Sequence, residues 1–174
     1  SAVCHGDKGI SLALDAIEKA QLAHPNINLR HRLEHSYLWN PELIKRAADL
    51  GVIWNTQLPV MAAAGRWATI EAWGDRAQYG FPVRSAMEAG IVISGGSDWT
   101  VATLDPMVGV HALVTRKLEP LEDGDVLNPE QAVSVLDAIR MYTYNGAYTV
   151  SEEAYKGSLE DGKLADIAVL SDDI

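Results

Sequence analysis

The sequence predicts an α/β fold in which parallel strands are covered by helices. Short, fully apolar runs alternate four times with stretches of helical periodicity, as is typical of parallel strands that are buried on both faces. Polar residues follow these runs at the strand ends, where parallel α/β folds place their active sites. Four such units amount to half of an eight-stranded (β/α)8 TIM barrel, whose complete form takes about 250 residues.

The first third of the chain is predicted to hold three strands and two helices. The apolar spacing after residue 10 fits an amphipathic helix, and Asn40 followed by Pro41 is a typical helix start, with Gly51 as its end. The predicted elements are a strand ending at 3–5, a helix over 10–23, a strand over 29–34, a helix over 41–50 and a strand over 52–57.

The rest of the chain is predicted to continue this alternation. A segment at 58–80, rich in Ala, Trp and Gly, is too long for a plain connection and is predicted to be a functional loop or lid. The most continuous apolar strand follows it, and the tail changes character at Gly157, where turn residues begin. The predicted elements are a helix over 82–89, a strand over 91–94, a helix from 128 towards 146 and a last strand over 164–170.

Composition and charge exclude several classes of function. The chain has 174 residues, of which 48% are hydrophobic and 22% charged, so it is long enough to bury a core. With 14 basic and 24 acidic residues its formal net charge is −10, which opposes binding to nucleic acid or to an anionic membrane. Since no apolar run approaches the roughly 18–20 residues that cross a bilayer, we expect neither kind of partner.

The cysteine content bears on the cell compartment of the protein, and the first residues bear on whether the chain is a part of a longer fold. Cys4 is the only cysteine, so no internal disulfide can form, and a cytoplasmic location is favoured although the sequence leaves the compartment undetermined. The chain begins Ser-Ala-Val-Cys-His-Gly-Asp without an initiator Met, as though it opens inside a buried strand. This start predicts that the chain is a part of a longer fold.

Three residues at predicted strand ends could bind a metal ion. His5 ends the first strand, His35 ends the second, and Asp98 follows the strand at 91–94. Imidazole and carboxylate groups suit zinc or another divalent ion. A single strand-end histidine is more often a hydrogen-bonded polar group than a ligand, but its recurrence at the same end of successive strands favours a site.

Other kinds of chemistry find less support. Cys4 and His5 are adjacent on a strand and point to opposite faces, so no thiol nucleophile is predicted. No glycine-rich phosphate loop of the P-loop type is present, which weighs against an unrelated hydrolase or isomerase on a barrel. Trp99 directly follows Asp98, where a substrate pocket would be lined.

Several motifs follow one another in a characteristic order along the whole chain. They are His-Gly-Asp-Lys-Gly-Ile at 5–10, Arg-His-Arg-Leu-Glu-His at 30–35, Gly-Gly-Ser-Asp-Trp at 95–99 and Gly-Lys-Leu-Ala-Asp at 162–166. In this order they resemble the amidohydrolase superfamily, in the amidohydrolase 3 branch that includes N-substituted formamide deformylase-like and other metal-dependent hydrolases.

The resemblance implies a (β/α)8 metallohydrolase of which this chain is the C-terminal half. Residues 1–150 would supply strands 5 to 8 of the TIM barrel with their helices, and residues 151–174 a returning strand of a small β-sandwich. Strands 1 to 4 would lie in a missing N-terminal half, which is expected to be the partner of this chain. The isolated chain is therefore expected to be inactive, and to associate with that half or with itself as a homo-oligomer.

The resemblance also implies roles for individual residues. His35 matches the strand 6 metal ligand, and Asp98 matches the strand 8 aspartate that binds metal and acts as the general base. The family motif places its strand 5 ligand at Val3, and His5, on the same strand face, is expected to replace it. Arg116 matches a recurrent family position and either orients the substrate or packs beneath the site.

The implied reaction is hydrolysis of a C–N amide-type bond in a small-molecule substrate. A divalent metal ion, with zinc expected, would lower the pKa of bound water to about 7 and polarise the scissile carbonyl. Asp98 would take the proton of the water and pass it to the leaving nitrogen, with Trp99 and Arg116 contacting the substrate. The alternative is a non-catalytic scaffold or interaction domain that kept the barrel and lost its metal site, which Val3 in the ligand position favours.

Overall fold

Four parallel strands form the centre of the computed structural model, which describes residues 1–25, 29–118, 125–172 and 174. Their order in the sheet is β1-β2-β3-β4, and every neighbouring pair is parallel. The prediction of an α/β fold with a parallel sheet is thus confirmed. The strands are β1 (Ala2–Cys4), β2 (Arg32–His35), β3 (Ile53–Thr56) and β4 (Ile93–Gly95).

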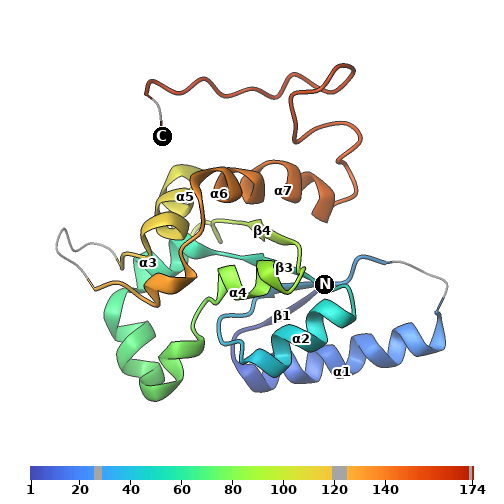
Figure 1. Ribbon diagram of the computed structural model, residues 1–174, viewed down its shortest axis with the longest axis vertical. Coiled ribbons are helices and arrows are strands. Elements are labelled where there is room, and N and C mark those ends of the chain that lie inside the picture. The colour runs from blue at the N-terminus through green and yellow to red at the C-terminus, as the bar shows by residue number, and fades with distance from the viewer. Residues whose placement is uncertain (26–28, 119–124, 173) are drawn as a thin grey trace.

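Helices connect the strands, because parallel neighbours need a long crossover between them. In Figure 1, α1 and α2 lie beside β1 and β2, and α5, α6 and α7 lie beyond β4. The helices are α1 (Asp7–Ala23), α2 (Pro41–Asp49), α3 (Leu58–Arg66), α4 (Val83–Glu88), α5 (Pro106–Thr115), α6 (Val135–Tyr142) and α7 (Tyr144–Thr149), with a π-helical segment η1 (Trp67–Glu71) and the 3-10 turns η2 (Gly74–Tyr79) and η3 (Pro129–Gln131).

Three of these helices begin with a side chain that accepts a hydrogen bond from a backbone N–H group of the first turn. Asn40 Oδ1 accepts a hydrogen bond from Leu43 N at 2.9 Å, which confirms the predicted start of α2. Asp105 and Ser134 cap α5 and α6 in the same way. At the other end of α2, Gly51 takes the left-handed φ of 63° that favours glycine, so the chain can turn into β3.

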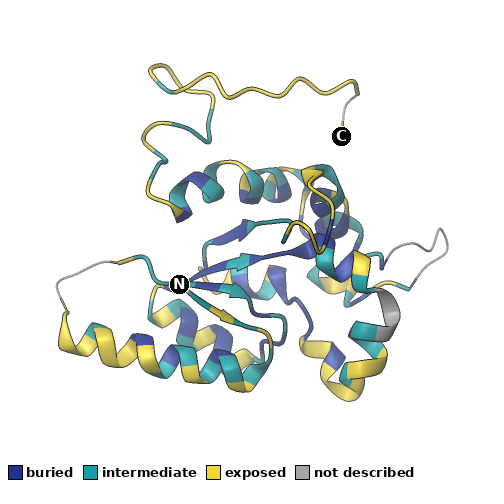
Figure 2. Cartoon of the chain, turned by 180° about the vertical axis from the view of Figure 1, so that it is seen from behind, coloured by how far each residue is buried: buried dark blue, intermediate teal, exposed yellow. Residues whose placement is uncertain are grey.

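The core lies between the sheet and its covering helices. Trp39 and Trp54 are almost completely buried, and their ring centroids lie 5.4 Å apart. Figure 2 shows the buried residues concentrated on the strands and on the helix faces turned towards them. Side chains of this core come from every layer of the fold, including Ile10, Leu14, Leu33, Ile93, Leu113 and Met141.

The segment at 58–80 is helical, which corrects the prediction of a loop or lid. It forms α3, η1 and η2 in succession, and α3 packs against α5. Leu58 and Met61 are fully buried in the core. Burial of these apolar side chains stabilises the helix, so tertiary packing and the helix propensity of its alanines outweigh the length and the glycine content that indicated a loop.

Two predictions for the C-terminal part also differ from the structure. The predicted helix from Asn128 is broken into η3 and α6, because Ser134 begins a new helix by accepting a hydrogen bond from Asp137 N at 3.1 Å. The predicted strand at 164–170 is absent: these residues are exposed and form no strand within the described chain, with Val169 93% exposed, although Leu164 N donates to Tyr155 O at 2.8 Å. A strand needs a neighbouring strand as its hydrogen-bond partner, and the described residues provide none for this tail.

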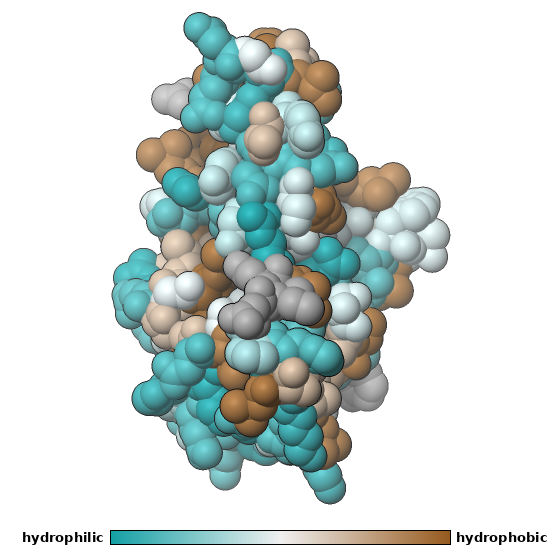
Figure 3. All heavy atoms as spheres, turned by 90° about the vertical axis from the view of Figure 1, so that its right-hand side faces the viewer, coloured by the Kyte–Doolittle hydropathy of each residue, from teal (hydrophilic) through white to brown (hydrophobic). Residues whose placement is uncertain are grey.

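The tail leaves apolar side chains in contact with solvent. Leu159, Leu164, Ile167 and Val169 are each at least 60% exposed. In Figure 3 apolar residues are visible at the upper end of the molecule, which is the end that carries the tail in Figure 1. Among the helices of the described residues, none is long and apolar enough to span a membrane.

Candidate active site

The carboxyl ends of the strands bring together two of the predicted metal ligands. His5 directly follows β1, and His35 is the last residue of β2, the neighbouring strand. Their rings meet edge to face, with centroids 4.8 Å apart and 63° between the planes. The sheet thus places two imidazoles in contact, as the sequence predicts for residues at the ends of adjacent parallel strands.

An unusual turn after β2 sets the position of the His35 ring. His35 and Ser36 have left-handed φ angles of 63° and 54°, which residues other than glycine rarely adopt. The turn is hydrogen-bonded to the end of β1, since Ser36 N donates to Cys4 O at 2.6 Å and Tyr37 N donates to His5 O at 2.8 Å. The two strand ends are therefore tied together beyond the sheet.

Tyr37 is a residue of the site that the sequence analysis missed. Its phenol oxygen lies 2.5 Å from His35 Nδ1, and its ring stacks on His5. The one available signal is that an aromatic residue stands two positions after His35, which on a strand would put both side chains on one face. Tyr37 reaches the site through the left-handed turn instead, and hydrophobic periodicity does not predict such a turn.

Asp98 supplies the negative charge of the site. It follows β4 by three residues, and its own backbone is left-handed, with φ 55°. Burial lowers the pKa of His35; the Asp98 carboxylate opposes this shift, and the neighbouring His5 adds to it. Burial also raises the pKa of Tyr37, and the charge of Asp98 raises it further. The lowered pKa of His35 favours its neutral form, which is the form that can bind a metal ion.

The amide side chains of Asn55 and Gln57, at the end of β3, lie next to the loop that carries Asp98. Gln57 Nε2 donates to Asn55 Oδ1 at 2.9 Å, while Gln57 Oε1 is buried without a hydrogen-bond partner among the described residues. A Cβ on Gly96 would lie 3.2 Å from Asn55 Oδ1 and 3.4 Å from Gln57 Nε2. Glycine at this position lets the loop that carries Asp98 pass close to β3.

The two predicted substrate contacts lie in very different surroundings. Trp99 follows Asp98 and is 62% exposed. Arg116 is completely buried, and its guanidinium donates to Leu127 O and Phe81 O, both at 3.0 Å. Burial lowers the pKa of Arg116 to about 10. Arg116 packs between segments of this chain, so a substrate role for it, which stays a prediction, requires these contacts to open.

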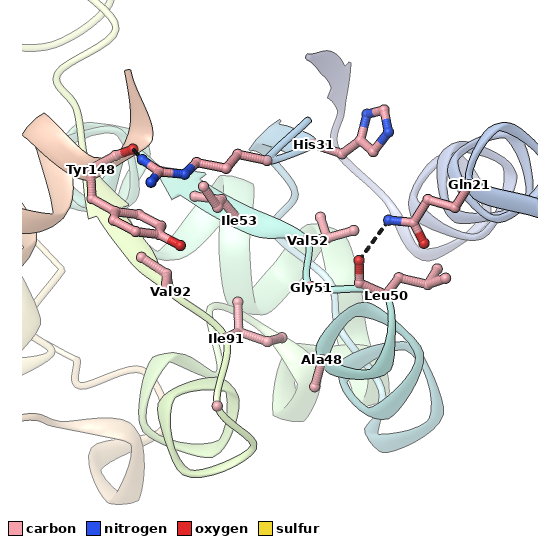
Figure 4. Close-up of a pocket in the computed structure, with 12 residues that line it drawn as sticks. Gln21, His31, Ala48, Leu50, Gly51, Val52, Ile53, Ile91, Val92 and Tyr148 are labelled. Atoms are coloured by element: carbon pink, nitrogen blue, oxygen red, sulfur yellow. Dashed lines mark hydrogen bonds between the residues drawn. The ribbon is translucent and has the colours of Figure 1, made fainter. Parts of the chain in front are cut away.

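A cavity lies at the opposite, amino ends of the strands. It has a volume of about 260 Å³ and is lined in part by His31, Gln21 and Arg30 (Figure 4). Gln21 Nε2 donates to Leu50 O at 2.8 Å, and Arg30 Nη1 donates to Tyr148 O at 2.7 Å. The cavity is thus separated from the imidazole pair by the length of the sheet, and its Gln21 and Arg30 side chains are hydrogen-bonded to the protein.

The fit of a metal ion to these residues can be tested on the geometry. Protein zinc sites usually take about three or four protein ligands. His5 and His35 offer two imidazoles in contact, but no group of three or more His, Cys, Asp or Glu side chains in the described part of the chain is arranged to hold a metal ion. The described residues by themselves therefore offer only a part of a zinc coordination sphere, and the role of Asp98 as a ligand stays a prediction.

Comparison with known proteins identifies a family for this chain. The model of the amidohydrolase family matches residues 1–174. A putative amidohydrolase, YtcJ, from Bacillus subtilis is 33% identical over 97% of this chain and 31% of its own length, and an N-substituted formamide deformylase from Arthrobacter pascens is 33% identical over 97% of this chain and 30% of its own length.

A solved structure supports the same assignment. A metal-dependent hydrolase from Pyrococcus horikoshii OT3 superposes with a TM-score of 0.82 and 27% identity, over 98% of this chain and 33% of its own. The chain spans about a third of the length of these relatives. On the match over its whole length, this chain belongs to the amidohydrolase family.

Proposed function

We propose that this chain is the C-terminal half of the barrel of a metal-dependent amidohydrolase that cleaves a C–N amide-type bond in a small molecule. The observation that carries the proposal is the contact between His5 and His35 at the carboxyl ends of adjacent parallel strands, with the charge of Asp98 acting on it. The names of the relatives, an N-substituted formamide deformylase and a metal-dependent hydrolase, support the reaction class.

In this proposal the chain contributes strands 5 to 8 of a (β/α)8 barrel. His5 and His35 bind a divalent ion, expected to be zinc, and the other ligands come from strands 1 to 4, with Asp98 close by or among them. When bound, the ion supplies an activated water and polarises the carbonyl of the substrate. The isolated chain, which offers two imidazoles, is then inactive.

Asp98 is the proton carrier of the proposed reaction. Its carboxylate lies at the end of β4, near the imidazole pair, and it accepts a proton from the attacking water and donates it to the leaving nitrogen. Trp99, exposed beside Asp98, lines the space for the organic part of the substrate. Arg116 has one of two roles. It packs beneath the site and holds the segments at Phe81 and Leu127 in place, or it contacts the substrate after its hydrogen bonds to these two carbonyl groups open.

Asp98→Asn tests the chemistry, and it is best made in the protein that carries all eight strands. Loss of the proton carrier is expected to lower hydrolysis of small N-acyl and N-formyl amines by about 100-fold to 10,000-fold. Asp49→Asn, which alters an exposed carboxylate on α2, is the matched control and should leave hydrolysis unchanged. Product amine released per minute is the measurement.

Metal content tests the ligands separately. Elemental analysis should find zinc or another divalent ion in the unsubstituted protein and a loss of it in His5→Gln and His35→Gln. His111→Gln, on the exposed side of α5, should retain the metal. The proposal fails if no divalent ion is bound and Asp98→Asn hydrolyses as fast as the unsubstituted protein.

That failure would favour a second function, a non-catalytic scaffold derived from the barrel. Two points support it: the resemblance to the family motif places the strand 5 ligand at Val3, and the described residues form no group of three ligands. An anomalous X-ray signal from soaked zinc near His5 and His35 separates the two functions, because a scaffold without a metal site would show none.

A further inference from the structure

Tyr37 lies against both imidazoles of the candidate site. Its ring stacks on His5, with centroids 5.2 Å apart and 22° between the planes, and meets the His35 ring edge-on at 5.4 Å. Its phenol oxygen lies 2.5 Å from His35 Nδ1. One side chain therefore restrains the two rings at once.

The surrounding fold holds Tyr37 in this position. Its backbone N–H donates to His5 O, and its own carbonyl accepts from Phe81 N, both at 2.8 Å. The Phe81 ring, which is 1% exposed, packs on the Tyr37 ring with centroids 4.7 Å apart. Three segments meet here: the end of β1, the left-handed turn after β2 and the chain that precedes α4. The phenol oxygen is thus placed before any ligand binds.

The contact between the Tyr37 hydroxyl and His35 Nδ1 bears on which nitrogen of His35 carries the proton. A neutral imidazole carries one N–H, and its second nitrogen keeps a lone pair. Metal-binding histidines usually donate the N–H of the non-ligating nitrogen to a protein oxygen, which sets both the tautomer and the direction of the ring. In His35 the nitrogen next to a protein side-chain oxygen is Nδ1.

We propose that Tyr37 is a positioning residue whose phenol oxygen accepts the Nδ1–H of His35, so that Nε2 keeps the lone pair for a metal ion. Its ring holds His5 beside this nitrogen through the stacking contact. The inference rests on the proposed metal-dependent function and adds to it a residue that acts through the ligands and touches neither metal nor substrate.

Tyr37→Phe tests this role because it keeps the ring and removes only the oxygen. Tyr142→Phe is the matched control, since it removes a hydroxyl whose contact is Gly96 O at 3.5 Å instead of a histidine. Long-range ¹H–¹⁵N NMR spectra of the metal-free chain report which nitrogen of His35 carries the proton, at a pH above about 7.5, where imidazoles of ordinary pKa are neutral. Titration of the protein that carries all eight strands with Co²⁺, followed by its visible absorption, measures metal affinity.

In the unsubstituted chain we expect His35 to carry its proton on Nδ1. Tyr37→Phe should shift the ring towards the Nε2-protonated tautomer and weaken Co²⁺ binding by about 10-fold to 100-fold, while Tyr142→Phe should match the unsubstituted chain in both measurements. An Nε2-bound proton in the unsubstituted chain, or an unchanged tautomer in Tyr37→Phe, would overturn the inference.

The two measurements separate this inference from the proposed function. Absence of Co²⁺ binding by the protein that carries all eight strands contradicts metal binding by His5 and His35, whereas the tautomer of His35 is read without metal and still decides the role of Tyr37. If Tyr37→Phe does not fold, the tautomer in the unsubstituted chain alone decides the matter.

Discussion

At the scale of single residues, the site is built from backbone conformations that side chains normally avoid. His35, Ser36 and Asp98 have φ angles of 63°, 54° and 55°. Such conformations cost about 1–3 kcal/mol each and persist where the surroundings enforce them, often at functional sites. Here the hydrogen bond from Ser36 N to Cys4 O is part of that enforcement. The result is a sharp exit from β2 that keeps the imidazole of His35 next to His5.

The sequence was sufficient to predict which strand-end residues belong to the candidate site, but it did not predict the contacts that the turn after β2 makes. His5, His35 and Asp98 each follow a short apolar run, so a pattern visible in the sequence leads to them. Tyr37 reaches His35 only because two consecutive residues take left-handed angles. Such angles depend on hydrogen bonds between segments about 30 residues apart, as with Ser36 and Cys4, and local propensities do not contain them.

Gly109 provides a test of packing at a single residue. A Cβ there would lie 1.8 Å from the phenol oxygen of Tyr142, so Gly109→Ala forces this ring to move and should lower the free energy of unfolding by about 1–3 kcal/mol. Gly146→Ala is the control, because it is also helical and its Cβ would meet nothing closer than 3.9 Å. It should be neutral or stabilising by up to about 1 kcal/mol.

Urea unfolding of both glycine variants measures these changes. The cost of Gly109→Ala should disappear when Tyr142 is also replaced by Ala, because the two residues are in direct contact. A cost that persists in the double variant would show that the contact with Tyr142 is not its cause.

At the scale of the elements, the amino end of β2 is fastened to the chain that follows α7. Arg30 pairs with Glu153 at 2.6 Å, donates to Tyr148 O at 2.7 Å, and lies 3.9 Å above the centre of the Tyr148 ring. The residues joined are more than 100 positions apart in the sequence, so this connection restrains the fold as a whole. It lies at the opposite end of the sheet from His5 and His35.

The Arg30–Glu153 pair predicts a specific pH dependence. The hydrogen bond from the Arg30 guanidinium lowers the pKa of Glu153 in the folded chain. A lowered pKa means that the carboxylate stabilises the fold above its unfolded pKa of about 4.3, and that this contribution is lost as the pH falls through the folded pKa. Glu153→Gln should therefore be less stable than the unsubstituted chain near neutral pH, and the difference should vanish in acid.

Urea unfolding at a series of pH values between about 3 and 7 measures this difference. Asp49→Asn is the control, since Asp49 pairs with Lys45 on an exposed face of α2, where ion pairs contribute little. A difference between Glu153→Gln and the unsubstituted chain that stays constant with pH would contradict the assigned role of the carboxylate.

At the scale of the whole molecule, the sheet has two end strands. β1 and β4 each pair with one neighbour, and α6 and α7 pack against β4. Val3 on β1 is 67% exposed, and the apolar residues of the tail are exposed as well. Exposed strand edges and apolar surface favour pairing with another chain. The half-barrel proposal assigns these surfaces to the missing N-terminal half or, in its absence, to a second copy.

Self-association of this chain is the corresponding prediction. Sedimentation velocity should show the average mass rising with protein concentration, because unpaired strand edges and apolar surface associate. Val3→Lys places a charge on β1 and should reduce association, whereas Leu12→Lys, on the exposed face of α1, should not. A chain that stays monomeric at all concentrations, or an equal effect of both substitutions, would contradict the role of the β1 edge.

The sequence by itself determined the alternation of strands and helices, the capped start of α2 and the polar residues at the strand ends. These features depend on apolar periodicity and on short-range hydrogen bonds, such as that from Leu43 N to Asn40 Oδ1. Only the tertiary structure decided that 58–80 is helical, that the tail at 164–170 lacks a neighbouring strand and that Tyr37 joins the imidazole pair. Each of these three features depends on whether a segment distant in the sequence covers a side chain or forms a hydrogen bond with a backbone group. Local sequence cannot specify such contacts.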